Sequence, residues 1–128
     1  TLRSEDGGER VNELNISLFD AMKGTVDGED EWQLKRFLCS QTVMMAVEGI
    51  PAVYIHSLLA TPNDEDAVRT TGHNRSINRR QLDVPTLKRA LANEETSESQ
   101  GFRELTRRLQ VRCSQAPKLL YRPGKTIR

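Results

Sequence analysis

The sequence is poor in the residues that build a hydrophobic core. Of its 128 residues only 36% are apolar and 5% aromatic, whereas 29% are charged. The longest apolar runs, 43–47 and 51–55, are far shorter than the roughly 20 residues that a membrane-spanning helix needs. The composition therefore excludes a membrane span in this sequence and indicates one surface-rich domain at most.

Cysteine and histidine are equally scarce. The two cysteines, Cys39 and Cys113, and the two histidines, His56 and His73, have none of the spacings of a disulfide framework or a zinc site. Motifs of nucleotide-binding loops, serine hydrolases and zinc proteases are missing too. We therefore predict no metal and no cofactor. We predict buried or half-buried thiols on apolar helix faces, in a protein of the cytoplasm.

The formal net charge of +1 hides an uneven distribution. Residues 1–66 hold 13 acidic and five basic residues, and residues 101–128 hold one acidic and eight basic residues. A basic end can contact phosphates. One hypothesis is therefore a small helical binding module whose basic C-terminal helix meets nucleic acid or an acidic partner. A solvated helix face is the preferred interpretation, because no aromatic residues interleave with the arginines to stack on bases.

Hydrophobic periodicity predicts a helix over 29–48, with Asp27 or Gly28 as its N-cap and Gly49 at its end. The apolar face expected for this helix comprises Trp32, Leu34, Phe37, Leu38, Met44, Met45 and Val47. The next run, 52–59, is apolar and rich in β-branched and aromatic residues, which is typical of a parallel strand buried on both faces. Helix, tight turn and strand together indicate an α/β unit.

A long polar stretch over 60–80 follows the predicted strand, and loops of this length are usually functional. Asp64 and its acidic neighbours are expected to cap a helix rather than to act as catalytic carboxylates. Asp83 should cap one later helix, and Ser97 with Gln100 should form a capping box for another. The apolar face expected for this last helix comprises Phe102, Leu105, Leu109 and Cys113.

Four separate segments carry a family resemblance. They are 11–22 (VNELNISLFDAM), 49–54 (GIPAVY), 63–64 (ND) and 75–79 (RSINR). In this order and spacing they closely resemble the end of the catalytic domain in sucrose phosphorylase-type and glucosylglycerate phosphorylase-like enzymes. These enzymes belong to the α-amylase superfamily, glycoside hydrolase family 13. The resemblance covers roughly residues 10–118.

The resemblance implies an α/β fold that is the C-terminal portion of a (β/α)8 TIM barrel: seventh helix, eighth strand and eighth helix, predominantly helical as a fragment. Residues 1–24 would belong to an inserted subdomain, residues 25–116 to the last barrel elements, and residues 117–128 to the lead into a missing C-terminal β domain. In this family the catalytic carboxylates lie on earlier strands. No catalytic residue is therefore expected in this sequence, and the fragment is expected to be inactive alone.

The resemblance also implies the chemistry of the parent enzyme, a retaining transfer of glucose from an α-glucoside to inorganic phosphate. Arg75 matches the sugar-binding arginine of the family. Asn12 and Glu13 fall on the acceptor-side loop, where Asn12 replaces the tyrosine that is usual in relatives. The expected partners are the α-glucoside and inorganic phosphate, with no nucleic acid and no membrane. With the open edges of 52–59, the fragment is expected to self-associate or to let this strand rearrange.

Overall fold

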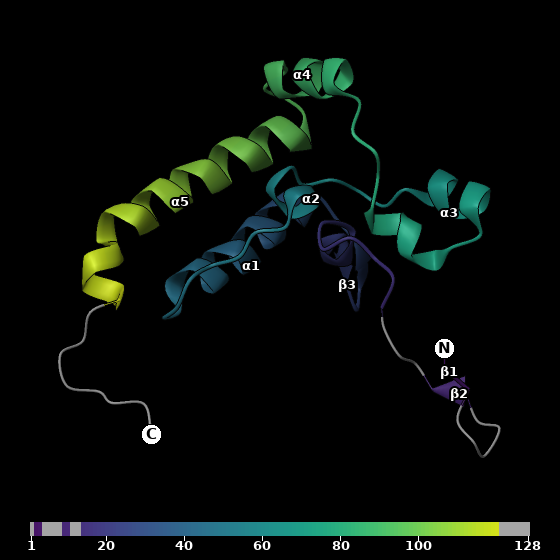
Figure 1. Ribbon diagram of the computed structural model, residues 1–128, viewed down its shortest axis with the longest axis horizontal. Coiled ribbons are helices and arrows are strands. Elements are labelled where there is room, and N and C mark those ends of the chain that lie inside the picture. Colours follow the sequence, from purple (N-terminus) through teal and green to yellow (C-terminus); the bar gives the residue numbers. More distant parts are fainter. Residues whose placement is uncertain (1, 4–8, 11–13, 121–128) are drawn as a thin grey trace.

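Two long helices dominate the structure. The computed structural model describes the backbone of residues 2–3, 9–10 and 14–120, and the side chains from 14 to 115. Helix α1 (Gln33–Ala46) packs along helix α5 (Ser97–Leu120), and the shorter helices surround one end of this pair (Figure 1). The predominantly helical character predicted for the fragment is confirmed.

The other elements of the described residues are short. The helices are η1 (Asp20–Met22), α2 (Ile55–Leu58), α3 (Glu65–Thr71), η2 (Asn74–Asn78) and α4 (Val84–Ala92). The strands form two antiparallel pairs, β1 (Leu2–Arg3) with β2 (Glu9–Arg10) and β3 (Gly24–Thr25) with β4 (Gly28–Glu29). The described part of the chain therefore holds no parallel sheet.

The strand predicted over 52–59 is not formed. The backbone is irregular up to Tyr54, and helix α2 follows directly. A parallel strand obtains its hydrogen bonds from neighbouring strands, and the described residues supply none. Helix α2 instead satisfies its backbone locally, for example through the 2.9 Å hydrogen bond from the Leu58 N–H to the Tyr54 carbonyl. The prediction was wrong because a lone strand has no partner.

The start of helix α1 also differs from the prediction. The helix begins at Gln33, and the residues expected as its cap belong to the β3–β4 hairpin. Gly28 has a φ of +111°, which favours glycine. A Cβ on Gly24 would lie only 2.4 Å from the Gly28 carbonyl oxygen. The two glycines thus allow the backbones of β3 and β4 to approach closely enough to form the hairpin. Helix α1 therefore begins only after the hairpin ends.

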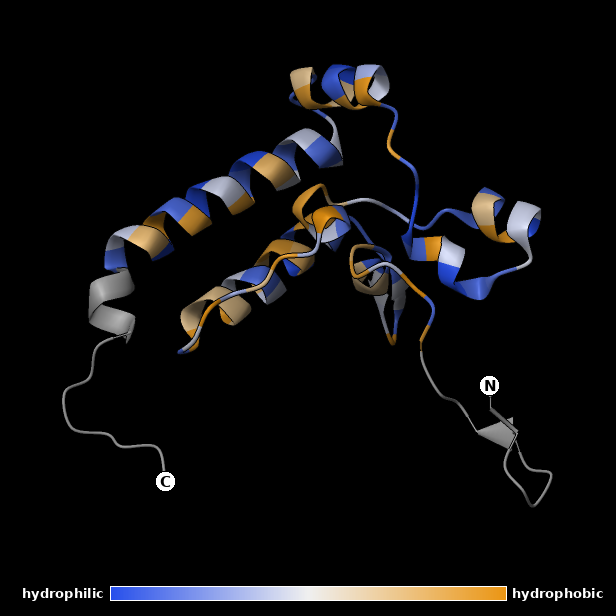
Figure 2. Cartoon of the chain, in the orientation of Figure 1, coloured by the Kyte–Doolittle hydropathy of each residue, from blue (hydrophilic) through white to orange (hydrophobic). Residues whose placement is uncertain are grey.

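The hydrophobic core lies between α1 and α5. Phe37 and Leu105 are fully buried, and Met45 is nearly so. The ring of Phe19 meets Phe37 edge-on, with centroids 5.5 Å apart, an arrangement that aromatic quadrupoles favour. Figure 2 shows apolar residues recurring along both helices. The apolar face predicted for α1 is therefore confirmed at Phe37 and Met45, and Leu34, Leu38 and Met44 pack against the core. Trp32 and Val47 of the predicted face are exposed.

Helix α5 buries only part of the predicted face. Leu105 is buried and Leu109 packs against the core, as predicted, but Phe102 and Cys113 are exposed. Gly101 and Arg112 are buried instead. Gly101 allows a close approach of α2, and Arg112 is held by backbone carbonyls at the end of α1. Both contacts join residues far apart in the sequence, so hydrophobic periodicity does not reveal them.

Helix caps follow the sequence closely. Asp64 begins α3 and Asp83 begins α4, and each side chain accepts a 2.9 Å hydrogen bond from the backbone N–H three residues later. Both predicted caps are confirmed. At α5 the cap is Thr96 rather than Ser97, because the Thr96 hydroxyl accepts from the Ser99 N–H at 3.2 Å. The capping box predicted for Ser97 with Gln100 is not formed, and the N-cap lies one residue earlier.

Substitution of Gly101 by alanine tests the contact between α2 and α5. A Cβ at this position would lie 2.8 Å from the Cβ of the fully buried Ala60. Overpacking costs about 1–3 kcal/mol, whereas alanine returns about 0.5–1 kcal/mol in a helix. We expect Gly101→Ala to lower the free energy of unfolding by about 1 kcal/mol in urea titrations. Gln110→Ala, at an exposed position of α5, is the control, and equal stability of G101A and the parent would contradict the close contact.

Candidate functional site

The polar stretch 60–80, predicted as a functional loop, is folded. Helices α3 and η2 pack against each other within it. The hydroxyl oxygens of Thr71 and Ser76 lie 2.8 Å apart, and the Asp64 N–H donates to the Ile77 carbonyl at 2.8 Å. These bonds link both ends of α3 to η2. The segment is therefore a small helical unit with a defined shape.

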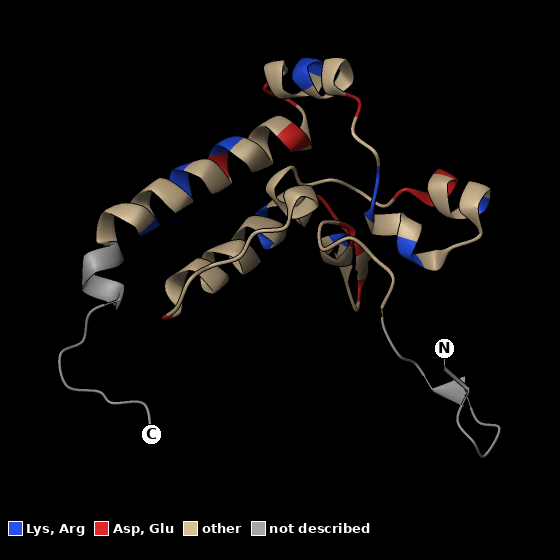
Figure 3. Ribbon diagram, in the orientation of Figure 1, with Lys and Arg blue, Asp and Glu red and all other residues tan. Residues whose placement is uncertain are grey.

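Arg75 lies in η2, on the surface of this unit. The Tyr54 hydroxyl donates to the Asn78 carbonyl at 3.2 Å, which ties the end of the segment 51–54 to the turn that carries Arg75. Figure 3 shows positive charge on this part of the chain. The structure thus presents Arg75 at an ordered, accessible turn. Its role in sugar binding stays a prediction.

The N-terminal segment is held against the start of this unit. The Ser17 N–H donates to Asn63 Oδ1 at 2.7 Å, and the Asn63 N–H donates to Asp20 Oδ2 at 2.8 Å. Asp20 in turn accepts from Gln33 Nε2 at 3.2 Å, so that α1 takes part in the same network. The segments 11–22 and 63–64, which both carry the family resemblance, therefore meet through Asn63. Residue spacing alone did not indicate this contact.

The other two predicted site residues, Asn12 and Glu13, lie outside the described residues. Their acceptor-side role stays a prediction. Residues 14–19 form no strand, and Ser17 and Phe19 are buried within irregular backbone. Ser17 is buried where its N–H donates to Asn63, and Phe19 is buried where its ring packs in the core. Neither contact requires a strand.

A polar depression of about 410 Å³ lies at the first turn of α3. It combines carboxylates, an amide and two guanidinium groups, and the side chains of Asp66 and Arg69 form an ion pair within it. Arg75 is not among its lining residues. Such a mixture of donors and acceptors suits a ligand rich in hydroxyl groups. The lining residues are Asn63, Asp64, Glu65, Asp66, Arg69 and Arg80.

His56 is a buried titratable group for which the sequence predicts no role. Its ring stacks edge-on against Tyr54 with centroids 5.1 Å apart, and its Nδ1 has no hydrogen-bond partner. Burial lowers the pKa of His56, and the positive charge of Arg80 lowers it further. Both effects favour the neutral form of the imidazole. Within the described residues no group of three or more His, Cys, Asp or Glu side chains could hold a metal ion.

Both cysteines are exposed. The predicted burial of Cys39 and Cys113 on apolar faces was wrong. Cys113 is exposed because α5 turns Gly101 and Arg112 toward the rest of the molecule instead. Cys39 lies on α1 beside the buried positions Phe37 and Gln41 and points away from the core.

The arginines of α5 are engaged by other groups. Arg103 pairs with Glu94 at 3.1 Å, and Arg107 and Arg108 both pair with Glu104. These two cations lower the pKa of the Glu104 carboxyl. Figure 3 shows red and blue residues intermixed along this helix. The described part of α5 therefore carries no open basic stripe of the kind that nucleic-acid binding needs.

None of the helices in the described residues is both long enough and apolar enough to cross a membrane.

The chain is similar in sequence to phosphorylases of glycoside hydrolase family 13, which confirms the resemblance found in the motifs. It is 32% identical over 109 residues to the glucosylglycerate phosphorylase of Escherichia coli, a match of 85% of this chain and 19% of that protein. It is 35% identical over 100 residues to the glucosylglycerate phosphorylase of Spirochaeta thermophila, covering 78% of this chain and 17% of that protein. The sucrose 6(F)-phosphate phosphorylase of Thermoanaerobacterium thermosaccharolyticum is 34% identical over 77 residues, 60% of this chain and 14% of its own length.

The chain thus spans a fifth or less of the length of these relatives. No protein-family model and no solved structure matches it. A match of 109 residues within 128 must include residues 20–109, so the homology extends over α1, the Arg75 turn and much of α5.

Proposed function

We propose that this chain forms the last barrel elements of a retaining α-glucoside phosphorylase. Helix α1 would be the seventh barrel helix, the segment 52–59 the eighth strand, and α5 the eighth helix. The observation that carries the proposal is the homology to glucosylglycerate phosphorylases over 85% of the chain. The division into 1–24, 25–116 and 117–128, and the cytoplasmic location, stay predictions within it.

In this proposal the parent enzyme transfers glucose from an α-glucoside, either a glucosylglycerate-type donor or sucrose, to inorganic phosphate. A carboxylate forms a covalent glucosyl intermediate, a second carboxyl group moves the proton, and phosphate attacks in place of water. These carboxylates would lie on earlier barrel strands. The chain itself would supply one wall of the donor site and no catalytic group.

Arg75 is the residue proposed to contact the donor sugar. Its guanidinium offers five N–H donors in a fixed plane, which suits sugar hydroxyls and a neighbouring carboxylate. Its turn is braced by the Thr71–Ser76 contact and by Tyr54. Asn12 and Glu13 are proposed for the acceptor side, on the resemblance alone.

Two assays test the proposal. The isolated 128 residues should show no phosphorolysis of glucosylglycerate or sucrose 6(F)-phosphate, and turnover by this chain would refute its inactivity. In the second assay, residues 20–109 replace the homologous segment of the Escherichia coli glucosylglycerate phosphorylase. A chimera that melts cooperatively and releases glucose 1-phosphate supports the proposal, whereas one that melts cooperatively without activity counts against it.

The chimera also tests the role of Arg75. We expect Arg75→Gln to lower kcat/KM for phosphorolysis by about 10- to 100-fold, because the loss of one charge-assisted contact costs about 1.5–3 kcal/mol. Arg89→Gln, at an exposed position of α4, is the matched control and should leave kcat/KM unchanged. Equal activity of the two variants would remove Arg75 from the donor site.

Self-association of the isolated chain is part of the proposal. Large apolar side chains remain exposed on α1, on the segment that follows it and before η1. Examples are Leu14, Val47, Ile50 and Tyr54, with exposed fractions of 83%, 58%, 91% and 53%. In a barrel such residues would meet neighbouring strands and helices, and without them a second copy can cover the same surface. Size-exclusion chromatography with light scattering should therefore show dimers or larger species, and a monomer at all concentrations would contradict this.

A small helical binding module with a basic C-terminal helix was the alternative function. The pairing of the α5 arginines with Glu94 and Glu104 favours the phosphorylase proposal over it.

A further inference from the structure

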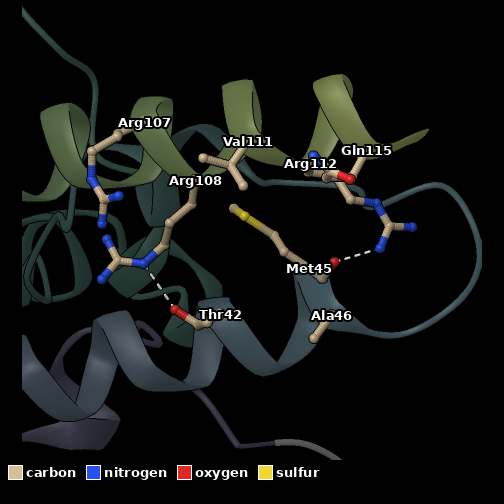
Figure 4. Close-up of a pocket in the computed structure, with 8 residues that line it drawn as sticks. All are labelled: Thr42, Met45, Ala46, Arg107, Arg108, Val111, Arg112 and Gln115. Carbon is tan, nitrogen blue, oxygen red and sulfur yellow. Dashed lines mark hydrogen bonds between the residues drawn. The ribbon is translucent and has the colours of Figure 1, made fainter. Parts of the chain in front are cut away.

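A groove between α1 and α5 combines an apolar floor with a cationic rim. Its volume is about 380 Å³, within the range of small-molecule sites. Met45, Ala46 and Val111 line the floor, and Arg107 and Arg108 stand at one end (Figure 4). No acidic residue lines the groove. The groove lies on a face that the proposed sugar site does not use.

Positive charge at this end of the groove exceeds the negative charge beside it. Arg107 and Arg108 both donate to the same Oε2 atom of Glu104, at 3.1 Å and 2.7 Å. One carboxylate therefore serves two guanidinium groups. The pair keeps about one positive charge, which an anion in the groove would neutralise at short range.

Unused hydrogen-bond donors accompany this charge. Arg108 donates through Nε to Thr42 Oγ1 at 2.8 Å and through Nη1 to Glu104. Arg107 uses Nε and Nη2 for Glu104. Nη1 of Arg107 and Nη2 of Arg108 each carry two further N–H groups. Within the described residues neither of these two nitrogens donates a hydrogen bond. The Thr42 contact also holds Arg108 in place and so reduces the entropy that binding would cost.

The apolar floor continues directly from these donors. Figure 4 shows the two guanidinium groups side by side, with the side chains of Met45 and Val111 next to them in the middle of the groove. Val111 is 54% exposed, so an apolar ligand would remove its surface from water. The guanidinium of Arg112 at the far end turns away toward the Met45 carbonyl and is occupied. The groove thus has an anion-binding end and an apolar end.

We propose that this groove binds a small amphiphilic monoanion, with a carboxylate on Arg107 and Arg108 and a short alkyl chain over Met45 and Val111. Charge complementarity selects the sign of the head group, and the apolar floor favours an alkyl chain over a bare ion. Inorganic phosphate, which has no apolar part, would bind weakly.

Octanoate is the probe for the test, titrated into the full 128-residue chain by calorimetry and by chemical shifts of the Met45 methyl group. We expect saturable binding with shifts at Met45. Hexanoate should bind about tenfold more weakly, because each buried methylene contributes about 0.8 kcal/mol. Octylammonium and inorganic phosphate should not saturate the site. Absence of saturable octanoate binding, or equal binding of octylammonium, would overturn the proposal.

Variants locate the site. Arg107→Gln should weaken octanoate binding by about tenfold or more, because charge-assisted hydrogen bonds are the strong ones. Arg103→Gln is the matched control, since Arg103 lies on the same helix outside the groove, and should bind octanoate as the parent does. Val111→Asn removes apolar floor at an exposed position and should also weaken binding. Unchanged affinity in R107Q, with or without an effect of V111N, would show that the groove recognises no anion.

Discussion

Replacement of Arg112 by methionine is expected to lower the free energy of unfolding by about 3 kcal/mol. Arg112 is only 7% exposed, and its guanidinium donates to three backbone carbonyls at the end of α1. Nη1 contacts the carbonyls of Met45 at 2.5 Å and Val47 at 2.8 Å, and Nη2 contacts that of Gly49 at 2.5 Å. Methionine keeps much of the apolar stem and removes the donors and the positive charge.

The size of this effect follows from the position of the carbonyls. The last carbonyls of a helix have no partner within it, and they carry the negative end of the helix dipole. Helix α1 has no basic residue in its own last turn, so Arg112 supplies both the donors and the positive charge from α5. A buried carbonyl left without a donor costs about 1–3 kcal/mol.

Arg103→Met is the control for this measurement. The side chain of Arg103 is 54% exposed and forms a surface ion pair with Glu94. Exposed pairs contribute about 0–1 kcal/mol, so this variant should unfold in urea close to the parent. Equal destabilisation by R103M and R112M would show that Arg112 does not hold the end of α1.

Phe37→Ala is expected to lower the free energy of unfolding by about 3–5 kcal/mol. Phe37 is fully buried on α1, and its ring packs edge-on against Phe19. Truncation removes apolar area from the core and leaves a cavity that the two long helices cannot close. A loss of this size is a large part of the stability of a small domain, so the variant is expected to lose its cooperative thermal transition.

Phe102→Ala is the matched control, because it deletes the same ring from a residue that is 38% exposed. Its cost should be about 1 kcal/mol, since less area leaves contact and water can fill the space. Circular dichroism during heating measures both variants. If F37A and F102A melted at the same temperature, the packing of α1 on α5 would not be the core of this chain.

Much of the local structure was predictable. The periodicity of α1 indicated its buried positions Phe37 and Met45, and Asp64 and Asp83 cap their helices as predicted. These features depend on residues within one or two turns of each other, which a sequence displays directly. The family resemblance was likewise readable from short motifs and was confirmed by the homologous phosphorylases.

The candidate site was predictable only in part. The motifs selected Arg75 and the segment 60–80, but they did not reveal that this segment folds as α3 and η2, nor that Asn63 joins it to Ser17. This contact joins residues 46 positions apart. Neither hydrophobic periodicity nor residue spacing predicts such a contact, because it depends on how distant segments fold against each other.

The sequence by itself determined the N-caps of α3 and α4, which family the chain resembles, and that the apolar residues are too few for a large core. Only the tertiary structure decided that 52–59 forms no strand and which face of α5 is buried. A strand forms where neighbouring strands complete its hydrogen bonds, and among the described residues none does so for this segment. Gly101 and Arg112 turn inward because Ala60 and the end of α1 lie opposite them. Hydrogen bonds and close packing between distant residues thus overrode the hydrophobic pattern.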